Sequence, residues 1–167
     1  MTCLRGAGAV CFGADPLSSL VRRSLSTYGV VVARPFARGR DPPRKLVRRD
    51  GGHWCTDSLD VLVHAGQPVC LGETTVRRYA PAALGSPSPG GSTAAAVVDV
   101  YRSDSREVRY STDPGAAHCG RLALELDPAS DSVVELRVSF GGEELRLCAV
   151  DTISGRTTRT AVPFACQ

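Results

Sequence analysis

The sequence predicts a mostly β protein, an antiparallel β-sandwich that follows a short N-terminal helical segment. Strand candidates in the second half of the chain begin about every 8–12 residues, which is the spacing typical of all-β sandwiches. Apolar and polar side chains alternate within them, most clearly at Leu122, Leu124 and Leu126. Such alternation indicates strands that bury one face. The candidates are 94–101, 108–110, 120–126, 133–140, 145–150 and 157–164.

A second alternating row predicts the other side of the core. Val134, Leu136, Val138 and Phe140 recur at every second position, so we expect them to face inward, with Glu125, Glu135 and Arg137 facing solvent. The Gly-Gly pair at 141–142 accepts positive φ and predicts a hairpin turn. Residues 151–155 predict a second turn.

The first half of the chain has weaker signals. Residues 4–14 indicate a short helix or turn, and Asp15-Pro16 suits a helix boundary. The β-branched run 28–33 predicts a strand, whereas the arginine, glycine and proline content of 34–53 predicts a long basic loop without regular structure. We expect a strand or short helix at 54–64, strands at 67–71 and 74–79, and a flexible loop at 81–91.

Composition limits the class of protein. Apolar residues make up 43% of the chain, but no run approaches the roughly 18 apolar residues that a membrane helix needs. Residues 6–14 alternate glycine with small residues and lack the leucine-rich core of a secretory signal. Seven cysteines without close pairing are a poor disulfide framework. These features predict a cytoplasmic protein, with the nucleus as an alternative.

Catalytic and metal-binding motifs are missing from the sequence. No nucleophile elbow, zinc-protease helix or phosphate loop occurs. His53 with Cys55 and His118 with Cys119 suggest zinc, but paired Cys-x-x-Cys spacing is lacking, so surface histidines and core cysteines are the favoured interpretation. Glu143 and Glu144 are neighbours whose side chains would point to opposite faces of a strand. We therefore expect no catalytic residues and no metal site.

The basic loop leaves two interpretations open. Its charges are either solvated, or they contact an anionic partner with steep salt dependence. Nucleic acid is the less favoured partner because few aromatic side chains interleave with the charges. The candidate residues for an anionic partner are Arg38, Arg40, Arg44, Lys45, Arg48 and Arg49, within the loop 34–50.

A series of short segments, in order, resembles the divergent subfamily 12 of the 70-kDa heat-shock proteins. No single segment is specific, but the order is. The segments are Gly-Ala-Val-Cys-Phe-Gly-Ala-Asp-Pro at 8–16, Val-Arg-Arg-Ser at 21–24, Thr-Tyr-Gly-Val at 27–30, Asp-Pro-Pro-Arg-Lys-Leu at 41–46, Asp-Gly-Gly-His-Trp-Cys-Thr-Asp at 50–57, Leu-Gly-Glu at 71–73, Thr-Asp-Pro-Gly at 112–115, Phe-Gly-Gly-Glu-Glu-Leu at 140–145 and Ala-Val-Asp at 149–151.

The resemblance implies a division of the chain. Residues 1–17 would be the end of the actin-like nucleotide-binding domain, 18–23 a connector, and 24–167 the β-sandwich of the substrate-binding domain. ATP is then a cofactor of the full-length family member only, because the phosphate-binding loops and catalytic carboxylates of that first domain are missing here. We expect this chain alone to hold no cofactor and not to be an enzyme. Arg22 and Arg23 stand where ordinary members have an acidic and apolar linker.

The resemblance also implies a peptide-binding pocket in the sandwich. Val30 and Ala33 would form one wall and Tyr79 an aromatic floor. Ala96 and Val98 would lie on the central strand, and Leu145 near the last wall. Ala96 is smaller than the usual valine, and Glu144 falls where an isoleucine is usual. The alternative is that all six candidates are ordinary core residues.

The sequence thus predicts a chaperone-like domain that binds extended peptides or a client protein. The alternative is a non-catalytic scaffold or regulatory domain with a closed pocket, which contacts anionic partners through the loop 34–50.

Overall fold

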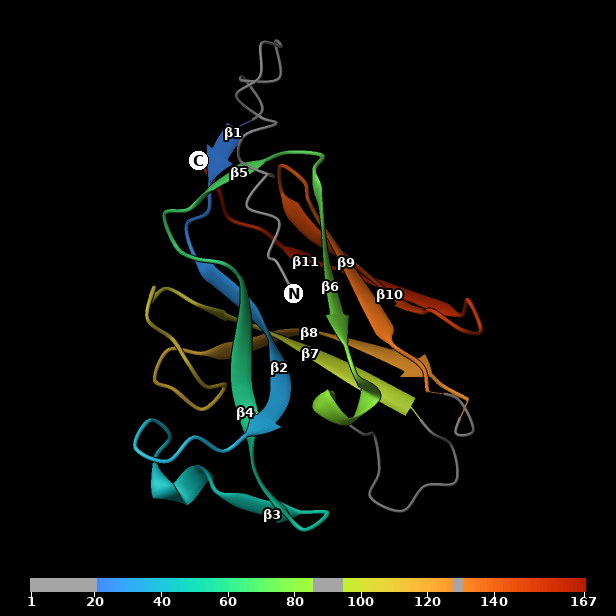
Figure 1. Cartoon of the computed structure of the whole chain (residues 1–167). Coiled ribbons are helices and arrows are strands. Elements are labelled where there is room, and N and C mark those ends of the chain that lie inside the picture. The colour runs from blue at the N-terminus through green and yellow to red at the C-terminus, as the bar shows by residue number, and fades with distance from the viewer. Residues whose placement is uncertain (1–20, 86–94, 128–130) are drawn as a thin grey trace.

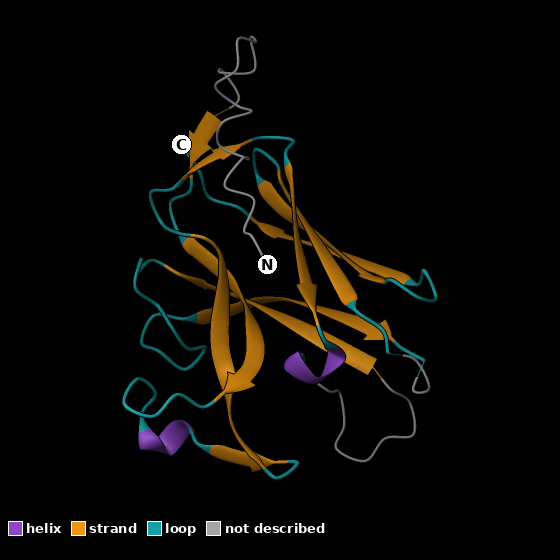
Figure 2. Cartoon of the chain, viewed as in Figure 1, coloured by secondary structure: helices purple, strands orange, loops and turns teal. Residues whose placement is uncertain are grey.

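The computed structural model describes residues 21–85, 95–127 and 131–167, and the predicted helical segment 4–16 lies outside them. The described chain is mostly strand, with two short 3₁₀ turns (Figures 1 and 2). Its strands form two stacked antiparallel sheets and a small two-stranded one. The predicted antiparallel β-sandwich is therefore confirmed.

The larger sheet has five strands and holds the longest elements. Their spatial order is β3 (Val47–Arg49), β4 (Gly52–Val63), β2 (Thr27–Pro35), β7 (Ala95–Ser103) and β8 (Ala117–Glu125). All neighbouring pairs are antiparallel. Strand β2 is central, and Tyr28 and Val30 on it are fully buried in the core between the sheets.

The second sheet has four strands, in the order β11 (Thr157–Pro163), β10 (Glu144–Asp151), β9 (Val134–Phe140) and β6 (Thr74–Tyr79). Strands β9, β10 and β11 follow one another along the chain as a meander, and β6 joins its far edge. A short pair, β1 (Val21–Arg23) with β5 (Pro68–Cys70), lies beside the C-terminus (Figure 1).

The core lies between the two sheets and is formed by the predicted alternating rows. Leu122, Leu124 and Leu126 are 2–6% exposed, and the row Val134, Leu136, Val138 and Phe140 is 0–6% exposed. Two further aromatic rings join them at one end, because the ring centroid of Phe164 lies 5.5 Å from that of Tyr28 and 5.6 Å from that of Phe140. The two-residue period of apolar side chains therefore correctly predicted which face of each strand points into the core.

The prediction of an irregular loop at 34–53 was wrong. Strand β2 continues to Pro35, a 3₁₀ turn η2 covers Pro43–Lys45, and β3 pairs with the start of β4. Asp50 and Gly51 connect β3 to β4 with φ of 49° and 75°. Two successive positive φ values are the geometry of a type I′ hairpin, for which Asp-Gly is a preferred sequence.

The predicted strand at 108–110 was also wrong. Only an isolated bridge forms there, between Tyr110 and Ser58. The carboxylate of Asp113 accepts hydrogen bonds from the backbone N–H groups of Arg109 (2.9 Å) and Tyr110 (3.1 Å), so these groups serve a turn instead of a strand ladder.

Two further segments are described in part. The expected loop 81–91 begins with a 3₁₀ turn η3 (Pro81–Ala83), and its residues 86–91 lie outside the described ranges. Of the expected connector 18–23, only Val21–Arg23 is described, as β1.

Candidate functional site

The predicted peptide-pocket residues lie mostly inside the sandwich. Val30 is 0% exposed, Ala96 and Val98 are each 1% exposed, and Leu145 is 0% exposed. All four belong to the hydrophobic core between the sheets. They are gathered in one region of the structure, but their side chains offer no surface to a ligand in this state.

Tyr79, the predicted aromatic floor, connects the two sheets at one edge. Its hydroxyl donates a 2.5 Å hydrogen bond to Asp60 of β4, and Arg77 of β6 contacts the same carboxylate at 3.5 Å. Burial, together with the neighbouring Asp60 charge, raises the pKa of Tyr79 well above its ordinary value. The phenol therefore stays protonated and acts as a structural donor.

Ala33 is the one predicted pocket residue that lines an open hollow. Strands β2 and β7 pair only where residues Thr27–Val30 lie opposite Val100–Ser103. Beyond Val30 and Val100, the two strands no longer pair with each other. A groove of about 330 Å³ lies at this separation. Its lining residues are Val31, Ala33, Arg49, Thr56, Leu84, Gly85, Val97 and Asp99.

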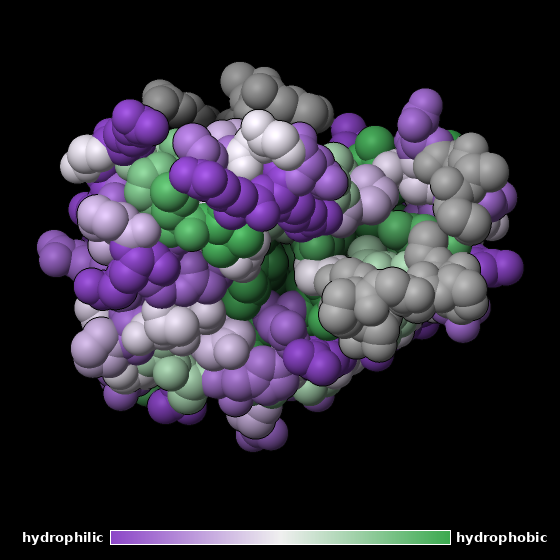
Figure 3. Space-filling model, turned by 90° about the horizontal axis from the view of Figure 1, so that it is seen from below, coloured by the Kyte–Doolittle hydropathy of each residue, from purple (hydrophilic) through white to green (hydrophobic). Residues whose placement is uncertain are grey.

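Figure 3 views this end of the molecule and shows a hollow with hydrophobic residues at its bottom and hydrophilic residues around its rim. One side of the groove contains a short piece of extended chain. The backbone N–H of Gly85 donates to Val97 O at 3.1 Å, and Val97 N–H donates to Gly85 O at 2.8 Å. At Val97, the edge of β7 that faces the groove is therefore already paired by an extended piece of its own chain.

A second hollow, of about 410 Å³, adjoins the first. The two share Thr56 of β4, so they form one surface across β3 and β4. The second hollow is more polar, and its lining residues are Arg44, Lys45, Val47, Thr56, Asp57 and Thr112.

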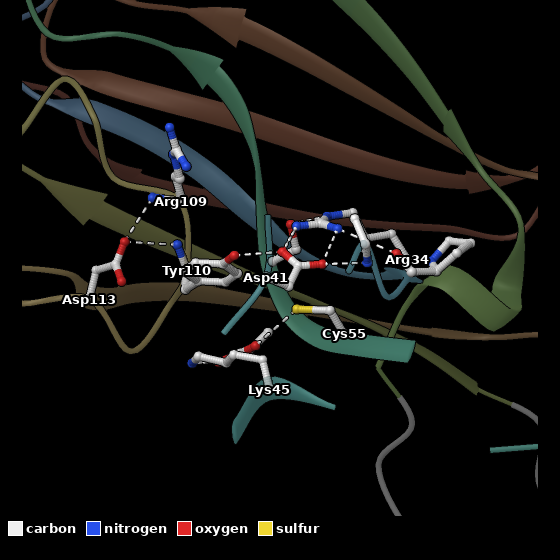
Figure 4. Close-up of polar contacts among 11 residues, drawn as sticks. Arg34, Asp41, Lys45, Cys55, Arg109, Tyr110 and Asp113 are labelled. Atoms are coloured by element: carbon white, nitrogen blue, oxygen red, sulfur yellow. Dashed lines mark hydrogen bonds and ion pairs between the residues drawn. The ribbon is translucent and has the colours of Figure 1, made fainter. Parts of the chain in front are cut away.

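Asp41 holds the loop that forms this second hollow. Its side chain has no exposed surface and accepts four hydrogen bonds, drawn in Figure 4. Arg34 donates two of them (2.6 and 2.7 Å), Tyr110 Oη one (2.6 Å) and the backbone N–H of Ala37 one (2.8 Å). The bonds from Arg34 and Tyr110 hold the pKa of Asp41 well below its usual range. The carboxylate thus joins β2, the following loop and the 108–113 segment.

Lys45 extends the same network toward the solvent. Its ammonium group donates to Asp57 and Thr112, and it lies 5.0 Å from the centroid of the Tyr110 ring. With its side chain only 10% exposed, Lys45 is largely committed to structure. It is therefore the weakest of the predicted contacts for an anionic partner.

The other candidates for an anionic partner are exposed. Arg38, Arg40, Arg44 and Arg48 form no ion pair with any residue in the described ranges. Arg49 has a long 3.5 Å contact to Asp50, which is itself 87% exposed. This end of the sandwich therefore carries positive charge that the described part of the chain does not neutralise.

Cysteine and histidine side chains do not assemble into a metal site in the described part of the chain, where no three potential ligands come together. His53 is exposed, whereas Cys55 is buried with its thiol 3.4 Å from Asp57, and burial raises its pKa. Cys55, Cys119, Cys148 and Cys166 are free thiols, but Cys70 is disulfide-bonded. The prediction that the seven cysteines are a poor disulfide framework therefore does not hold at Cys70.

Sequence reasoning missed most of the groove. Val31 and Val97 alternate with core residues and were assigned to no function, although their outward position follows from the same period. Leu84 and Gly85 belong to a segment that composition described only as a loop.

No helix within the described ranges is long and apolar enough to cross a membrane.

The fold and its groove define an antiparallel β-sandwich with an open, apolar cleft at one end. No family model matches the chain. It is 38% identical over 163 residues to human heat shock 70 kDa protein 12A, 37% identical over 163 residues to the mouse protein, and 39% identical over 168 residues to human heat shock 70 kDa protein 12B. Each match covers 94% of this chain.

These matches show that the sandwich is homologous to the C-terminal part of heat shock 70 kDa proteins 12A and 12B, as the resemblance implied. The chain spans about a quarter of the length of the relatives, 23% of protein 12A and 24% of human protein 12B.

Proposed function

We propose that the chain is a chaperone-like binding domain whose groove between β2 and β7 takes extended segments of a peptide or client protein. The observation that carries the proposal is the separation of these two strands beyond Val30 and Val100, which leaves an apolar hollow beside a strand edge. Homology to the C-terminal part of heat shock 70 kDa proteins supports it.

The binding mode follows from the chemistry of a strand edge. An extended segment satisfies its backbone groups by pairing with such an edge, while its alternate side chains enter pockets. Gly85 already pairs with Val97 in this way. Val31 is partly exposed and supplies the main apolar contact for a ligand side chain, whereas Ala33 (9% exposed) and Val97 (5% exposed) lie deeper in the groove.

The six residues that the resemblance implied then have different roles. Ala33 contacts the ligand. Val30, Ala96 and Val98 lie in the strands that form the floor and fix its position from below, together with Leu145 of the facing sheet. Tyr79 holds β6 against β4 and so keeps the sandwich closed at that edge.

A bulky residue in the groove tests the proposal. Val31→Trp fills the hollow from β2, and we expect it to weaken the binding of an extended apolar peptide by about tenfold or more, because ligand side chains lose their contacts. Fluorescence anisotropy with a labelled peptide rich in leucine and valine measures the affinity.

The matched control is Val76→Trp. Val76 is 38% exposed on β6 of the other sheet, so the same substitution there leaves the groove unchanged. Absence of saturable binding to the unsubstituted chain, or equal losses in the two variants, would contradict the proposal. Binding that ignores apolar content and collapses with salt would instead favour a scaffold that contacts anionic partners through the loop 34–50.

The remaining expectations are part of the same proposal. We infer that residues 1–17 end a nucleotide-binding domain, that 18–23 connect it to the sandwich at 24–167, and that ATP belongs to the longer protein. The chain by itself then has no ATP turnover, which a phosphate-release assay on the purified chain measures. A cytoplasmic location, or a nuclear one, is checked by imaging a tagged chain.

A further inference from the structure

We infer that the groove selects extended segments in which an apolar residue is flanked by acidic residues. This inference rests on the proposed function and adds the charge of the ligand. The apolar hollow and the basic hollow share Thr56, so a single extended segment passes from one to the other. Arginines line both parts, with Arg49 in the first and Arg44 in the second.

The charge at this end of the sandwich is not balanced by neighbouring carboxylates. Asp41 is fully occupied by Arg34, Tyr110 and Ala37, and Asp57 is paired with Lys45. Asp99, the one carboxylate that lines the apolar groove among the described residues, is paired with Arg121 at 2.7 Å and with His118 at 2.9 Å. Within the described ranges, Arg44 therefore has no acidic partner, and Arg49 has only the exposed Asp50.

Position makes these charges relevant to the ligand. Strand β3 forms the edge of the larger sheet, and its hairpin turn at Asp50-Gly51 fixes Arg49 opposite Gly52. The Asp41 and Lys45 networks fix the loop that carries Arg44. Both guanidinium groups are therefore attached to ordered backbone at the rim of the groove, where an acidic side chain of a bound segment can reach them.

A peptide fits this surface better than a nucleic acid does. The groove combines its positive rim with apolar walls from Val31, Leu84 and Val97, which a phosphate backbone would leave unfilled. Single-stranded nucleic acid needs aromatic platforms on which bases stack, and no aromatic residue of the described ranges lines either hollow. An acidic segment with an apolar anchor satisfies both parts of the surface.

Three labelled peptides with the same leucine-valine core test the inference, with flanks of aspartate and glutamate, of lysine, or of serine. We expect the acidic peptide to bind the unsubstituted chain about tenfold more tightly than the lysine peptide at low salt, from two partly exposed charge pairs. The difference should shrink as salt screens the charges. The Arg44→Glu/Arg49→Glu double variant should lose or reverse this preference.

The control variant is Arg159→Glu on β11. Arg159 is exposed and has no ion pair within the described ranges. Its substitution changes the net charge by as much as either Arg44→Glu or Arg49→Glu does, but on a strand far from the groove. It should keep the preference for acidic flanks, and thermal unfolding should show that all variants are folded.

Several results would overturn the inference. If acidic and lysine peptides bind equally and Val31→Trp weakens both, the proposed function stands and the charge preference is wrong. If no peptide binds, the proposed function itself fails. If the preference survives replacement of the leucine-valine core by serine, or an oligonucleotide displaces all peptides alike, the arginines form a general polyanion surface and not part of a peptide site.

Discussion

Asp41 shows how one residue organises the groove end of the sandwich. It is buried, yet four donors from three separate segments converge on its two oxygens. A buried carboxylate is tolerated only when it is paired and fully hydrogen-bonded. An amide in its place keeps only one of the two acceptor oxygens, so some of these donors lose their acceptor and the loop between β2 and β3 should lose its fixed position.

We expect Asp41→Asn to lower the urea midpoint of unfolding at neutral pH, because the amide cannot accept all four bonds. Asp50→Asn is the control, since Asp50 is 87% exposed and should change the midpoint little. Equal midpoints for the Asp41 variant and the unsubstituted chain would show that the network does not stabilise the fold.

The pH dependence of this contribution has a definite sign. The folded-state pKa of Asp41 is depressed, so its contribution to stability is complete above the ordinary aspartate pKa of about 3.9 and is lost as pH falls toward the folded value. The stability difference between the unsubstituted chain and Asp41→Asn should therefore be largest at neutral pH. Urea unfolding at several pH values below about 5 should show the two converging.

The sequence did not indicate this network. Asp41 and Tyr110 are 69 residues apart, and nothing in the local pattern of either predicts that they meet. The charges of the arginine-rich loop were expected to be either solvated or in contact with an anionic partner, whereas two of its cations, Arg34 and Lys45, form ion pairs within the chain. Long-range side-chain pairing depends on the completed fold, and the local pattern of a sequence carries little information about it.

At the scale of elements, strand prediction succeeded wherever one face of a strand is buried. The row from Val134 to Phe140 and the row from Leu122 to Leu126 have a two-residue period because each packs on the opposite sheet. Strand β3 failed this test because all three of its residues are exposed, so it has no apolar period. Its only local signal was the Asp50-Gly51 turn.

Gly120 of β8 lies where the larger sheet approaches β11 of the other sheet closely. A Cβ built there would collide with Cγ1 of Val162 on β11. We expect Gly120→Ala to destabilise the fold by about 1–3 kcal/mol, because β8 and β11 must move apart to admit the methyl group. Chemical denaturation measures the loss.

Gly142 provides a matched control for Gly120. It lies in the turn before β10, and a Cβ built there meets no atom within 4 Å. Gly142→Ala should therefore change stability by less than about 0.5 kcal/mol. A similar loss in both variants would mean that a general effect of removing glycine, and not the approach of the two sheets, causes the change.

At the scale of the whole molecule, the chain closes by joining its C-terminal end to the start of the sandwich. Arg23 and Gln167 exchange two backbone hydrogen bonds (2.7 and 2.9 Å), and Leu25 N–H donates to Ala165 O at 2.8 Å. Tyr28 adds a side-chain contact, because its hydroxyl donates to Pro163 O and accepts from Ala165 N–H. These contacts connect β1, the entry to the central strand β2 and the exit from β11.

Deleting residues 165–167 should therefore destabilise the entire sandwich and not only its end. Three backbone hydrogen bonds would be lost, and at about 1 kcal/mol each we expect roughly 3 kcal/mol, seen as a lower urea midpoint in a single transition. The double variant Cys166→Ala/Gln167→Ala is the control, because it removes side chains but keeps every backbone bond. If the deletion leaves stability unchanged, or the double variant loses as much as the deletion does, closure of the ends through the backbone is not what holds β1 and β2 in place.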